Sequence, residues 1–296
     1  MQQRTLKSWI NCSGIALHSG ARVSMTLYPA DPGTGVVFVR TDIKGRDPVI
    51  PARYDRVVDT RLCTVVGNES GITVATIEHL MAALNGCGID NARIEIDGPE
   101  VPIMDGSAEP FIFLIECTGT TLQDAPRKAI KILKSVTVGN AEKTASLSPA
   151  TETGFSFEIE FPNPAIGRES RSVRLDAGSF RREISRARTF GFLSDIENLR
   201  KMGLARGGSM QNAIVVSDDG VMNEEGLRFP DEFVRHKILD SVGDLYLAGL
   251  PIIGHYHGWK SGHALNNELL RTLFSRPDAW RIINCPADAC GLAACA

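Results

Sequence analysis

The segment Phe233–Asp244 holds the side chains that are best placed to do chemistry in this sequence. As a helix, it carries four residues on one stripe, because residues three and four apart share a helix face: His236, Asp240, Gly243 and Asp244. An imidazole and a carboxylate one turn apart can bind one ion without strain, and this pair of ligands suits zinc. A solvated polar face with a chance histidine explains the same helix equally well.

A second helix is predicted from Thr76, its N-cap, to a stop at Asn85-Gly86, with Glu78 and His79 in its first turn. The positive end of the helix dipole explains Glu78 but not His79, which adjoins the apolar stripe. Alone, His79 is explained as an ordinary surface or core histidine. Combined with the His-x-x-x-Asp pair, it would complete three ligands that leave one coordination position for water, with Glu78 as a base. The His-Glu-x-x-His motif of zinc peptidases is absent from the sequence.

His263 lies in the first turn of a third predicted helix, Gly262–Phe274, with Ser261 as its cap. The helix dipole disfavours an imidazolium there, so a general acid at this position would need a carboxylate, and Asp244 is available. A neutral histidine that donates to a backbone carbonyl is the alternative if the two helices do not meet. The hydroxyl of Thr189 can donate a hydrogen bond to a developing oxyanion.

Two further groups of residues suit the recognition of a substrate. Apolar residues that can line a tunnel, with ordinary core packing as the alternative, are Phe190, Phe192, Ile196, Leu199, Met202 and Leu204. An aromatic ring that stacks on a base and lysines that neutralise a diphosphate would form a nucleotide site. The residues for such a site, with solvated surface lysines as the alternative, are Glu160, Phe161, Lys143, Lys237 and Lys260.

The composition is that of a soluble globular protein: 296 residues, 43% of them hydrophobic and 23% charged, with a formal net charge of -3. No basic surplus indicates nucleic acid as a partner, and no apolar run approaches the length of a membrane span. The N-terminus lacks the apolar core of a signal peptide. The seven cysteines form no Cys-x-x-Cys pair, which favours reduced thiols in a cytoplasm over disulfides or a cysteine zinc site.

Each half of the chain runs from strands to helices, which predicts an α+β fold in which a sheet-and-helix layer pair occurs twice. The elements expected in the first half are strands Arg22–Tyr28, Val36–Arg40 and Ala92–Ile96, the helix containing Glu78, and a helix over Pro110–Glu116. Those of the second half are strands Ala129–Val138, Lys143–Leu147 and Phe155–Phe161, and helices Glu232–Leu247 and Gly262–Phe274. The polar segment Thr118–Arg127 predicts a boundary between domains 1–126 and 127–296.

Several segments, in this order, resemble the bacterial UDP-3-O-(3-hydroxyacyl)-N-acetylglucosamine deacetylase family, which carries out the committed step of lipid A synthesis in Gram-negative bacteria. They are Gly14–Gly20, Thr76–Leu80, Ile103–Ser107, Ser185–Phe192, Asn223–Phe229, His236–Asp244 and Lys260–Asn267. The resemblance spans nearly the whole chain. It implies two α+β domains, each a sheet-and-helix layer pair, whose helices meet at the active site. It also implies an insert near 190–215 that forms the passage for the acyl chain.

The resemblance implies a zinc-dependent amidohydrolase that removes the N-acetyl group of the acylated UDP-sugar. His79, His236 and Asp240 match the zinc ligands of the family. Glu78 matches the base that deprotonates the zinc-bound water. Thr189 matches the hydroxyl that, together with zinc, polarises the acetyl carbonyl.

The remaining matches concern proton transfer and substrate binding. His263, with Asp244 oriented towards it, matches the imidazolium that assists charge development or protonates the leaving amine. The matches to positions around the sugar and UDP are Lys237, Lys143, Glu160, Phe161 and Lys260, and the acyl passage matches Phe192–Leu204, with Phe190 beside it. The expected partner is therefore a small molecule, acylated UDP-N-acetylglucosamine. We expect a cytoplasmic monomer that makes at most transient contact with a membrane surface.

Two alternatives remain open from the sequence. One is a non-catalytic, zinc-stabilised module that binds nucleotide sugars, against which Glu78, Thr189 and His263 argue. The other is a zinc amidase for a different acylated amine, against which the nucleotide-contacting residues and the apolar insert argue. Two features depart from the family: Arg61 stands where relatives can carry an apolar residue, and the C-terminal tail contains Cys285, Cys290 and Cys295.

Overall fold

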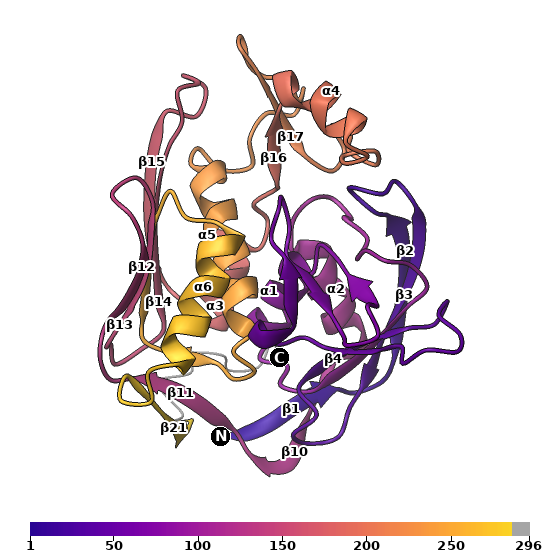
Figure 1. Ribbon diagram of the computed structural model, residues 1–296, viewed down its shortest axis with the longest axis vertical. Coiled ribbons are helices and arrows are strands. Elements are labelled where there is room, and N and C mark those ends of the chain that lie inside the picture. The colour runs from indigo at the N-terminus through magenta and orange to yellow at the C-terminus, as the bar shows by residue number, and fades with distance from the viewer. Residues whose placement is uncertain (286–296) are drawn as a thin grey trace.

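Two five-stranded sheets form the outer walls of the structure, a computed structural model that describes residues 1–285 (Figure 1). The strands of the first sheet are β2 (Ile10–Ile15), β3 (Arg22–Pro29), β9 (Ala92–Ile96), β4 (Val36–Arg40) and β5 (Val49–Pro51), in spatial order. Buried and more exposed residues alternate along β3, with Val23, Met25 and Leu27 on the inner face. This period of two gives the sheet one apolar face that must be covered.

The second sheet repeats the topology of the first. Its strands are β12 (Val136–Gly139), β13 (Thr144–Ser148), β20 (His255–Trp259), β14 (Gly154–Glu160) and β15 (Arg168–Arg174), in spatial order. In both sheets the strand that comes last in the chain lies at the centre. β9 is antiparallel to β3 and parallel to β4, just as β20 is antiparallel to β13 and parallel to β14.

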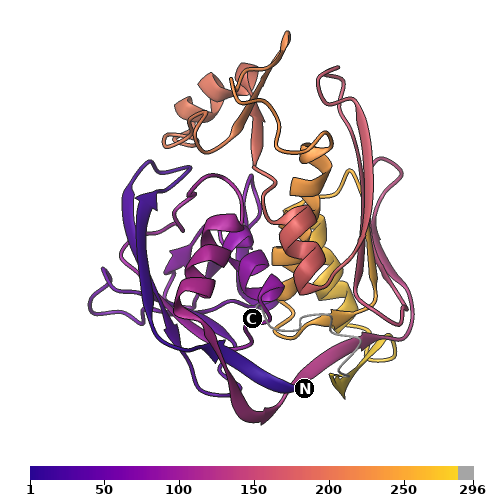
Figure 2. The same cartoon turned by 180° about the vertical axis from the view of Figure 1, so that it is seen from behind.

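Two helices from each half fill the space between the sheets (Figure 2). They are α1 (Glu78–Gly86), α2 (Glu109–Thr118), α5 (Glu232–Tyr246) and α6 (His263–Phe274). In each half one helix precedes the central strand and one follows it. The predicted α+β class is therefore confirmed, and α1 packs against α5 between the two sheets.

A smaller unit projects from the top of the molecule in Figure 1. It contains β16 (Phe190–Phe192), α4 (Leu193–Lys201), β17 (Ile214–Ser217) and β18 (Gly220–Val221). Upstream lie the short helix α3 (Ala177–Ser179) and one π-helical turn over Phe180–Ile184. The remaining strands are β1 (Gln2–Leu6), β6 (Val57–Asp59), β7 (Val65–Gly67), β8 (Thr73–Val74), β10 (Thr120–Pro126), β11 (Lys128–Ile132), β19 (Ile252–Ile253) and β21 (Trp280–Asn284), with a 3-10 turn at Tyr54–Arg56.

Three local expectations from the sequence are wrong. The predicted strand Ala129–Val138 is two strands, β11 and β12, which belong to different sheets. Thr76 does not cap α1, because its φ of 56° turns the chain and its hydroxyl donates to Glu100 instead. Ser261 does not cap α6, because Gly262 is the N-cap residue and no side chain accepts from the first turn; the Ser261 hydroxyl instead donates to Asn266.

The cysteines also differ in part from the expectation of reduced thiols. Cys12, Cys63 and Cys117 are free, whereas Cys285 is disulfide-bonded. Spacing along the chain could not predict this, because it does not report which cysteines meet in space. Cys290 and Cys295 lie outside the described residues. Among residues 1–285, every helix is too short or too polar to cross a bilayer.

Candidate metal centre

A close approach of α1 to α5 brings the two predicted groups of ligands together. The contact occurs at Gly243, where an added Cβ would lie 2.0 Å from the backbone oxygen of Glu78. Every residue of α5 except Lys237 is buried. The interpretation of α5 as a solvated polar face is therefore wrong, and its polar stripe faces the first turn of α1.

Two imidazoles and one carboxylate converge at this contact. The donor atoms of His79, His236 and Asp240 all lie within 4.8 Å of one another. Oδ1 of Asp240 is 3.6 Å from Nε2 of His79 and 3.3 Å from Nε2 of His236. All three side chains are at most 5% exposed. Two nitrogen ligands and one oxygen ligand at this spacing fit a mononuclear zinc site with a position left for water.

Neighbouring groups orient these donors. Nδ1 of His236 lies 3.0 Å from the carbonyl oxygen of Ala187. Because a carbonyl only accepts, the proton belongs on Nδ1 and the lone pair of Nε2 faces the other donors. The ammonium of Lys237 donates to Oδ2 of Asp240 at 2.6 Å, which leaves Oδ1 for an ion.

Glu78 lies beside the donor set in a dry environment. Its side chain is 3% exposed, and the backbone N–H of Thr64 donates to Oε2 at 3.0 Å. Burial raises the pKa of this carboxyl above its ordinary value. A carboxylate with a raised pKa accepts a proton more readily, which suits a general base.

His263 and Asp244 form the pair that the sequence predicted. Nδ1 of His263 is 2.8 Å from Oδ2 of Asp244, and the Thr64 hydroxyl and the Asn266 amide also donate to this carboxylate. Burial opposes a charge on His263, but the carboxylates of Asp244 and Glu78 outweigh it and raise the pKa to about 9. The imidazole is therefore protonated at neutral pH, and the alternative of a neutral histidine on a backbone carbonyl is wrong.

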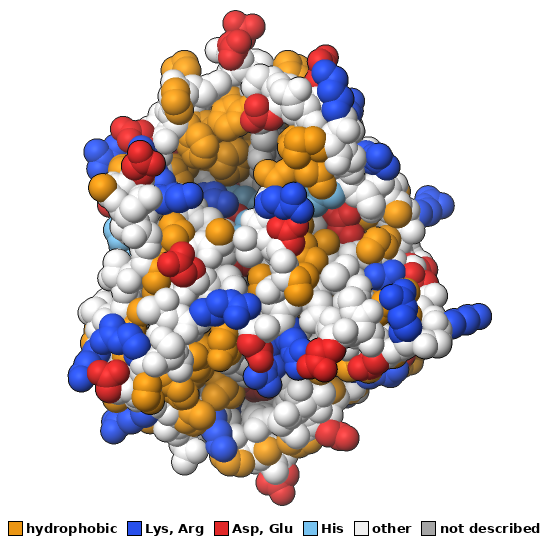
Figure 3. Space-filling view, viewed as in Figure 1, with side chains coloured by type: hydrophobic (Ala, Val, Ile, Leu, Met, Phe, Trp, Pro, Cys, Tyr) orange, Lys and Arg blue, Asp and Glu red, His pale blue; other side chains and the backbone are white. Residues whose placement is uncertain are grey.

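Thr189 lies in the wall of an apolar cavity of about 510 Å³. Its backbone is fixed on both sides, since its N–H donates to Gly106 and its carbonyl accepts from Ile214, each at 2.8 Å. Figure 3 shows apolar side chains around a hollow in the upper part of the molecule. The cavity lining includes Leu17, His18, Leu62, Phe190, Phe192, Leu193, Ile196, Leu199 and Ile214.

The residues predicted to bind a nucleotide occupy three places. Lys143 and Lys260 line a shallow hollow with Trp259, and Lys260 also pairs with Glu160. The ring of Phe161 instead packs against Phe190 and Phe192, at centroid distances of 5.8 and 5.6 Å. Lys237 stays at the metal centre, bound to Asp240.

Several residues that shape the site were not singled out from the sequence. Thr64 and Asn266 hold Asp244. Thr64 belongs to no motif, whereas Asn266 lies in Lys260–Asn267, a segment that carried the family resemblance. His18 lines the apolar cavity, and both of its ring nitrogens are buried without a hydrogen-bond partner within residues 1–285. Its segment, Gly14–Gly20, did carry the family resemblance, which was the available signal. Arg61 points to the surface and pairs with Asp59.

The donor set and the adjacent carboxylate have the composition of a mononuclear metal site in a hydrolase. The family model for UDP-3-O-acyl N-acetylglycosamine deacetylase matches residues 3–275. The chain belongs to this family.

Named relatives align over nearly their full length. The UDP-3-O-acyl-N-acetylglucosamine deacetylase of Myxococcus xanthus is 55% identical over 283 residues, which are 95% of this chain and 89% of the relative. The enzymes of the same name from Phenylobacterium zucineum and Acidithiobacillus ferrooxidans are 51% and 52% identical, and cover 95% and 96% of this chain. The alignments extend over 96% and 93% of those relatives.

Proposed function

We propose that this protein hydrolyses the N-acetyl group of UDP-3-O-acyl-N-acetylglucosamine, giving acetate and a free amine, as a zinc-dependent deacetylase of lipid A biosynthesis. The observation that carries the proposal is the convergence of His79, His236 and Asp240 beside a buried carboxylate, in a chain of this family. When bound by these three residues, zinc supplies Lewis acidity, which polarises the acetyl carbonyl and lowers the pKa of water.

Glu78 is the proposed general base. Its carboxylate is dry and adjoins the donor set, so it is placed to take a proton from the water that attacks the acetyl carbon. The hydrogen bond from the Thr64 N–H occupies Oε2 and leaves Oε1 for the water.

His263 and Thr189 are proposed to stabilise the charge that develops during the reaction. The imidazolium of His263, kept protonated by Asp244, would donate a proton to the departing amine or stabilise the negative charge on the acetyl oxygen. Hydrogen bonds on both sides fix the backbone of Thr189, so its hydroxyl would donate to the same oxygen without a further loss of backbone entropy. Protonated Glu78 is the alternative donor to the amine.

The substrate is proposed to lie across the two hollows. The apolar cavity, with Phe190 and Phe192 in its wall, would take the acyl chain. Lys143 and Lys260, with Glu160 and Phe161 nearby, would contact the sugar nucleotide, and the Lys237 ammonium would face the substrate from the metal centre. The apolar cavity thus suits the acyl chain, and the lysine-lined hollow suits the charged nucleotide at the other end of an acylated UDP-sugar.

The domain limits are also proposed. Strand β10 ends at Pro126 and pairs with β1, whereas β11 begins at Lys128 and pairs with β19 and β21. This change of partner supports domains at 1–126 and 127–296, with the acyl-passage insert near 190–215 and the active site between the helices. A cytoplasmic location and a monomeric state remain predictions.

Acetate release from UDP-3-O-acyl-N-acetylglucosamine tests the proposal directly. It is measured on the purified chain as isolated, after chelation, and after zinc is added back. Activity that is lost and then restored is the expected result. Absence of release from zinc-loaded protein would refute the deacetylase and favour a binding module or another amide substrate.

A further inference from the structure

An irregular segment, Arg186–Thr189, contacts the metal centre through one residue and lines the apolar cavity through another. The carbonyl of Ala187 accepts the hydrogen bond that orients His236, and Thr189 lines the apolar cavity. The segment precedes β16 and is not itself helix or strand. Its position must therefore be set by contacts other than regular backbone pairing.

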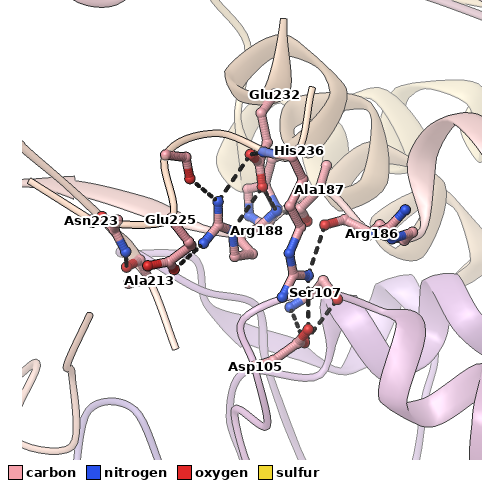
Figure 4. Close-up of polar contacts among 12 residues, drawn as sticks. Asp105, Ser107, Arg186, Ala187, Arg188, Ala213, Asn223, Glu225, Glu232 and His236 are labelled. Atoms are coloured by element: carbon pink, nitrogen blue, oxygen red, sulfur yellow. Dashed lines mark hydrogen bonds and ion pairs between the residues drawn. The ribbon is translucent and has the colours of Figure 1, made fainter. Parts of the chain in front are cut away.

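Arg188, between these two residues, forms a buried ion pair with the first turn of α5 (Figure 4). Its guanidinium donates to Glu232 from Nε at 2.9 Å and from Nη2 at 3.2 Å, and its backbone N–H donates to the same carboxylate at 3.0 Å. Nη2 also donates to the Gly226 carbonyl at 2.7 Å. The side chains of Arg188 and Glu232 are 2% and 0% exposed. Glu232 lies one turn before His236 on α5.

The carboxylate of Glu232 is fully satisfied in this position. A fourth donor, the backbone N–H of Arg228, reaches its second oxygen at 2.5 Å. A buried charge is tolerated only when it is paired and hydrogen-bonded, and the forked geometry of a guanidinium allows one arrangement. The pair therefore fixes where segment 186–189 lies along α5.

A second contact attaches the same segment to the first half of the chain. Nη1 of Arg228 donates to Oδ2 of Asp105 at 2.8 Å and to the carbonyl of Arg186 at 3.0 Å. Asp105 in turn accepts from the hydroxyl and N–H of Ser107, which fixes its turn. The next residue, Gly106, accepts the hydrogen bond from Thr189.

We propose that Glu232 and Arg188 are positioning residues for the metal centre. By fastening segment 186–189 to α5, they keep the Ala187 carbonyl on Nδ1 of His236, so that Nε2 remains the free donor, and they hold the Thr189 hydroxyl in place. The effect on His236 depends only on the donor set. The effect on the Thr189 hydroxyl rests on the proposed function.

The test compares two glutamates that bind the same guanidinium. Glu232→Gln keeps the shape but removes the charge and turns an amide N–H towards converging donors. Glu225 pairs with Nη1 of Arg188 at 2.7 Å from the solvent side and is 59% exposed, so Glu225→Gln is the matched control. Zinc affinity is measured on the purified full chain by competition with a chelator, and kcat and KM by acetate release.

For Glu232→Gln we expect zinc affinity to fall about 10- to 100-fold, as is typical when a partner behind a metal ligand is changed. We expect kcat to fall at least about tenfold with little change in KM, because the Thr189 contact is made in the transition state. The zinc affinity and kcat of Glu225→Gln should both stay within about twofold of wild type, because exposed ion pairs contribute little. Wild-type zinc affinity and kcat in a folded Glu232→Gln protein would overturn the proposal.

Two further variants keep the test decisive. If Glu232→Gln does not fold, Arg188→Lys retains the charge but loses the forked contact. It should lower zinc affinity about tenfold, and an unchanged affinity would overturn the proposal. Gly86→Ala strains α1 against Phe180, away from this pair. It should reduce stability without reducing zinc affinity. If Gly86→Ala lost as much zinc affinity as Glu232→Gln, the role of Glu232 would be structural only.

A wild type that binds zinc but releases no acetate would refute the proposed function alone, since the affinity comparison needs no substrate.

Discussion

At the scale of single residues, the pair of His263 and Asp244 determines how activity should depend on pH. Burial opposes the imidazolium, but the adjacent carboxylates raise its pKa to about 9. An acid must carry its proton to act, so kcat/KM is expected to fall as pH rises through about 9. Burial also raises the pKa of Glu78, which must be ionised to act as a base, so the acidic limb should lie above the ordinary range of a glutamate.

Asp244→Asn tests the origin of the alkaline limb. Among the groups that raise the pKa of His263, Asp244 contributes most, and asparagine keeps its shape while removing its charge. The alkaline limb of the kcat/KM profile should therefore move to lower pH. A limb that stays in place would assign it to a group other than His263.

Glu78→Gln separates the proposed base from the metal ligands. The amide oxygen can still accept from the Thr64 N–H, but the side chain can no longer take a proton. We expect turnover to fall by about 10²- to 10⁴-fold, the usual contribution of a general base. Zinc content, measured by elemental analysis, should stay at the wild-type level. Loss of zinc together with activity would contradict the assignment of Glu78 as a base alone.

Residue types and spacing predicted part of this site but not the groups that support it. His236, Asp240 and Asp244 were predictable because one helix turn separates them, and their common face is a property of the sequence. Thr64 is 180 positions from Asp244, to which its hydroxyl donates. A threonine has no chemical signature of such a contact, so only the fold identifies it. The same holds for Glu232, which the dipole of α5 would explain as an ordinary acidic residue in a first turn.

At the scale of elements, the crossing of α1 and α5 depends on Gly243. A Cβ there would lie 2.0 Å from the Glu78 carbonyl oxygen and 3.1 Å from the Ala82 nitrogen, both backbone atoms that cannot rotate away. Gly243→Ala should force the helices apart, lower the free energy of unfolding by ~1–3 kcal/mol and weaken zinc binding, because His79 lies on one helix and Asp240 on the other. Thermal unfolding and chelator competition measure the two effects.

Gly86→Ala is the matched control for this crossing. Its Cβ would meet the ring of Phe180 at 2.1 Å, so it too strains α1, but at the end far from the ligands. It should lower stability while zinc affinity is maintained. Equal zinc affinities in the two variants would show that the separation of α1 and α5 does not control the metal centre.

Elements were predictable where a single periodicity ran along them. The strands Val36–Arg40 and Ala92–Ile96 and helix α5 match their predictions to within a residue at each end. The predicted helix starts at Thr76 and Ser261 were wrong because both hydroxyls bond to side chains instead of to the helix N-terminus: Thr76 to the distant Glu100, and Ser261 to Asn266 within α6. The prediction of a single strand over Ala129–Val138 was wrong because β11 and β12 both carry apolar residues. They differ in the strands with which they pair, which the local pattern does not report.

At the scale of the whole molecule, the two halves share one strand order and one placement of helices. The order of elements predicted a repeated layer pair, but not that the last strand of each half enters the centre of its sheet. That insertion joins residues far apart in the chain, as in the pairing of Tyr256 with Phe155. Because such pairing depends on long-range closure rather than local pattern, the sequence alone did not specify it.

The apolar cavity, like the metal centre, is built from both halves of the chain. Leu17, His18 and Leu62 come from the first half, and the wall from Thr189 to Met222 comes from the second. If this cavity binds the acyl chain, each methylene removed should cost ~0.8 kcal/mol, or roughly fourfold in kcat/KM, until the chain no longer reaches it. Acetate release from substrates of decreasing chain length measures the slope. Equal kcat/KM for acylated and non-acylated UDP-sugars would mean that the cavity serves another purpose, since burial of an alkyl chain cannot be energetically neutral.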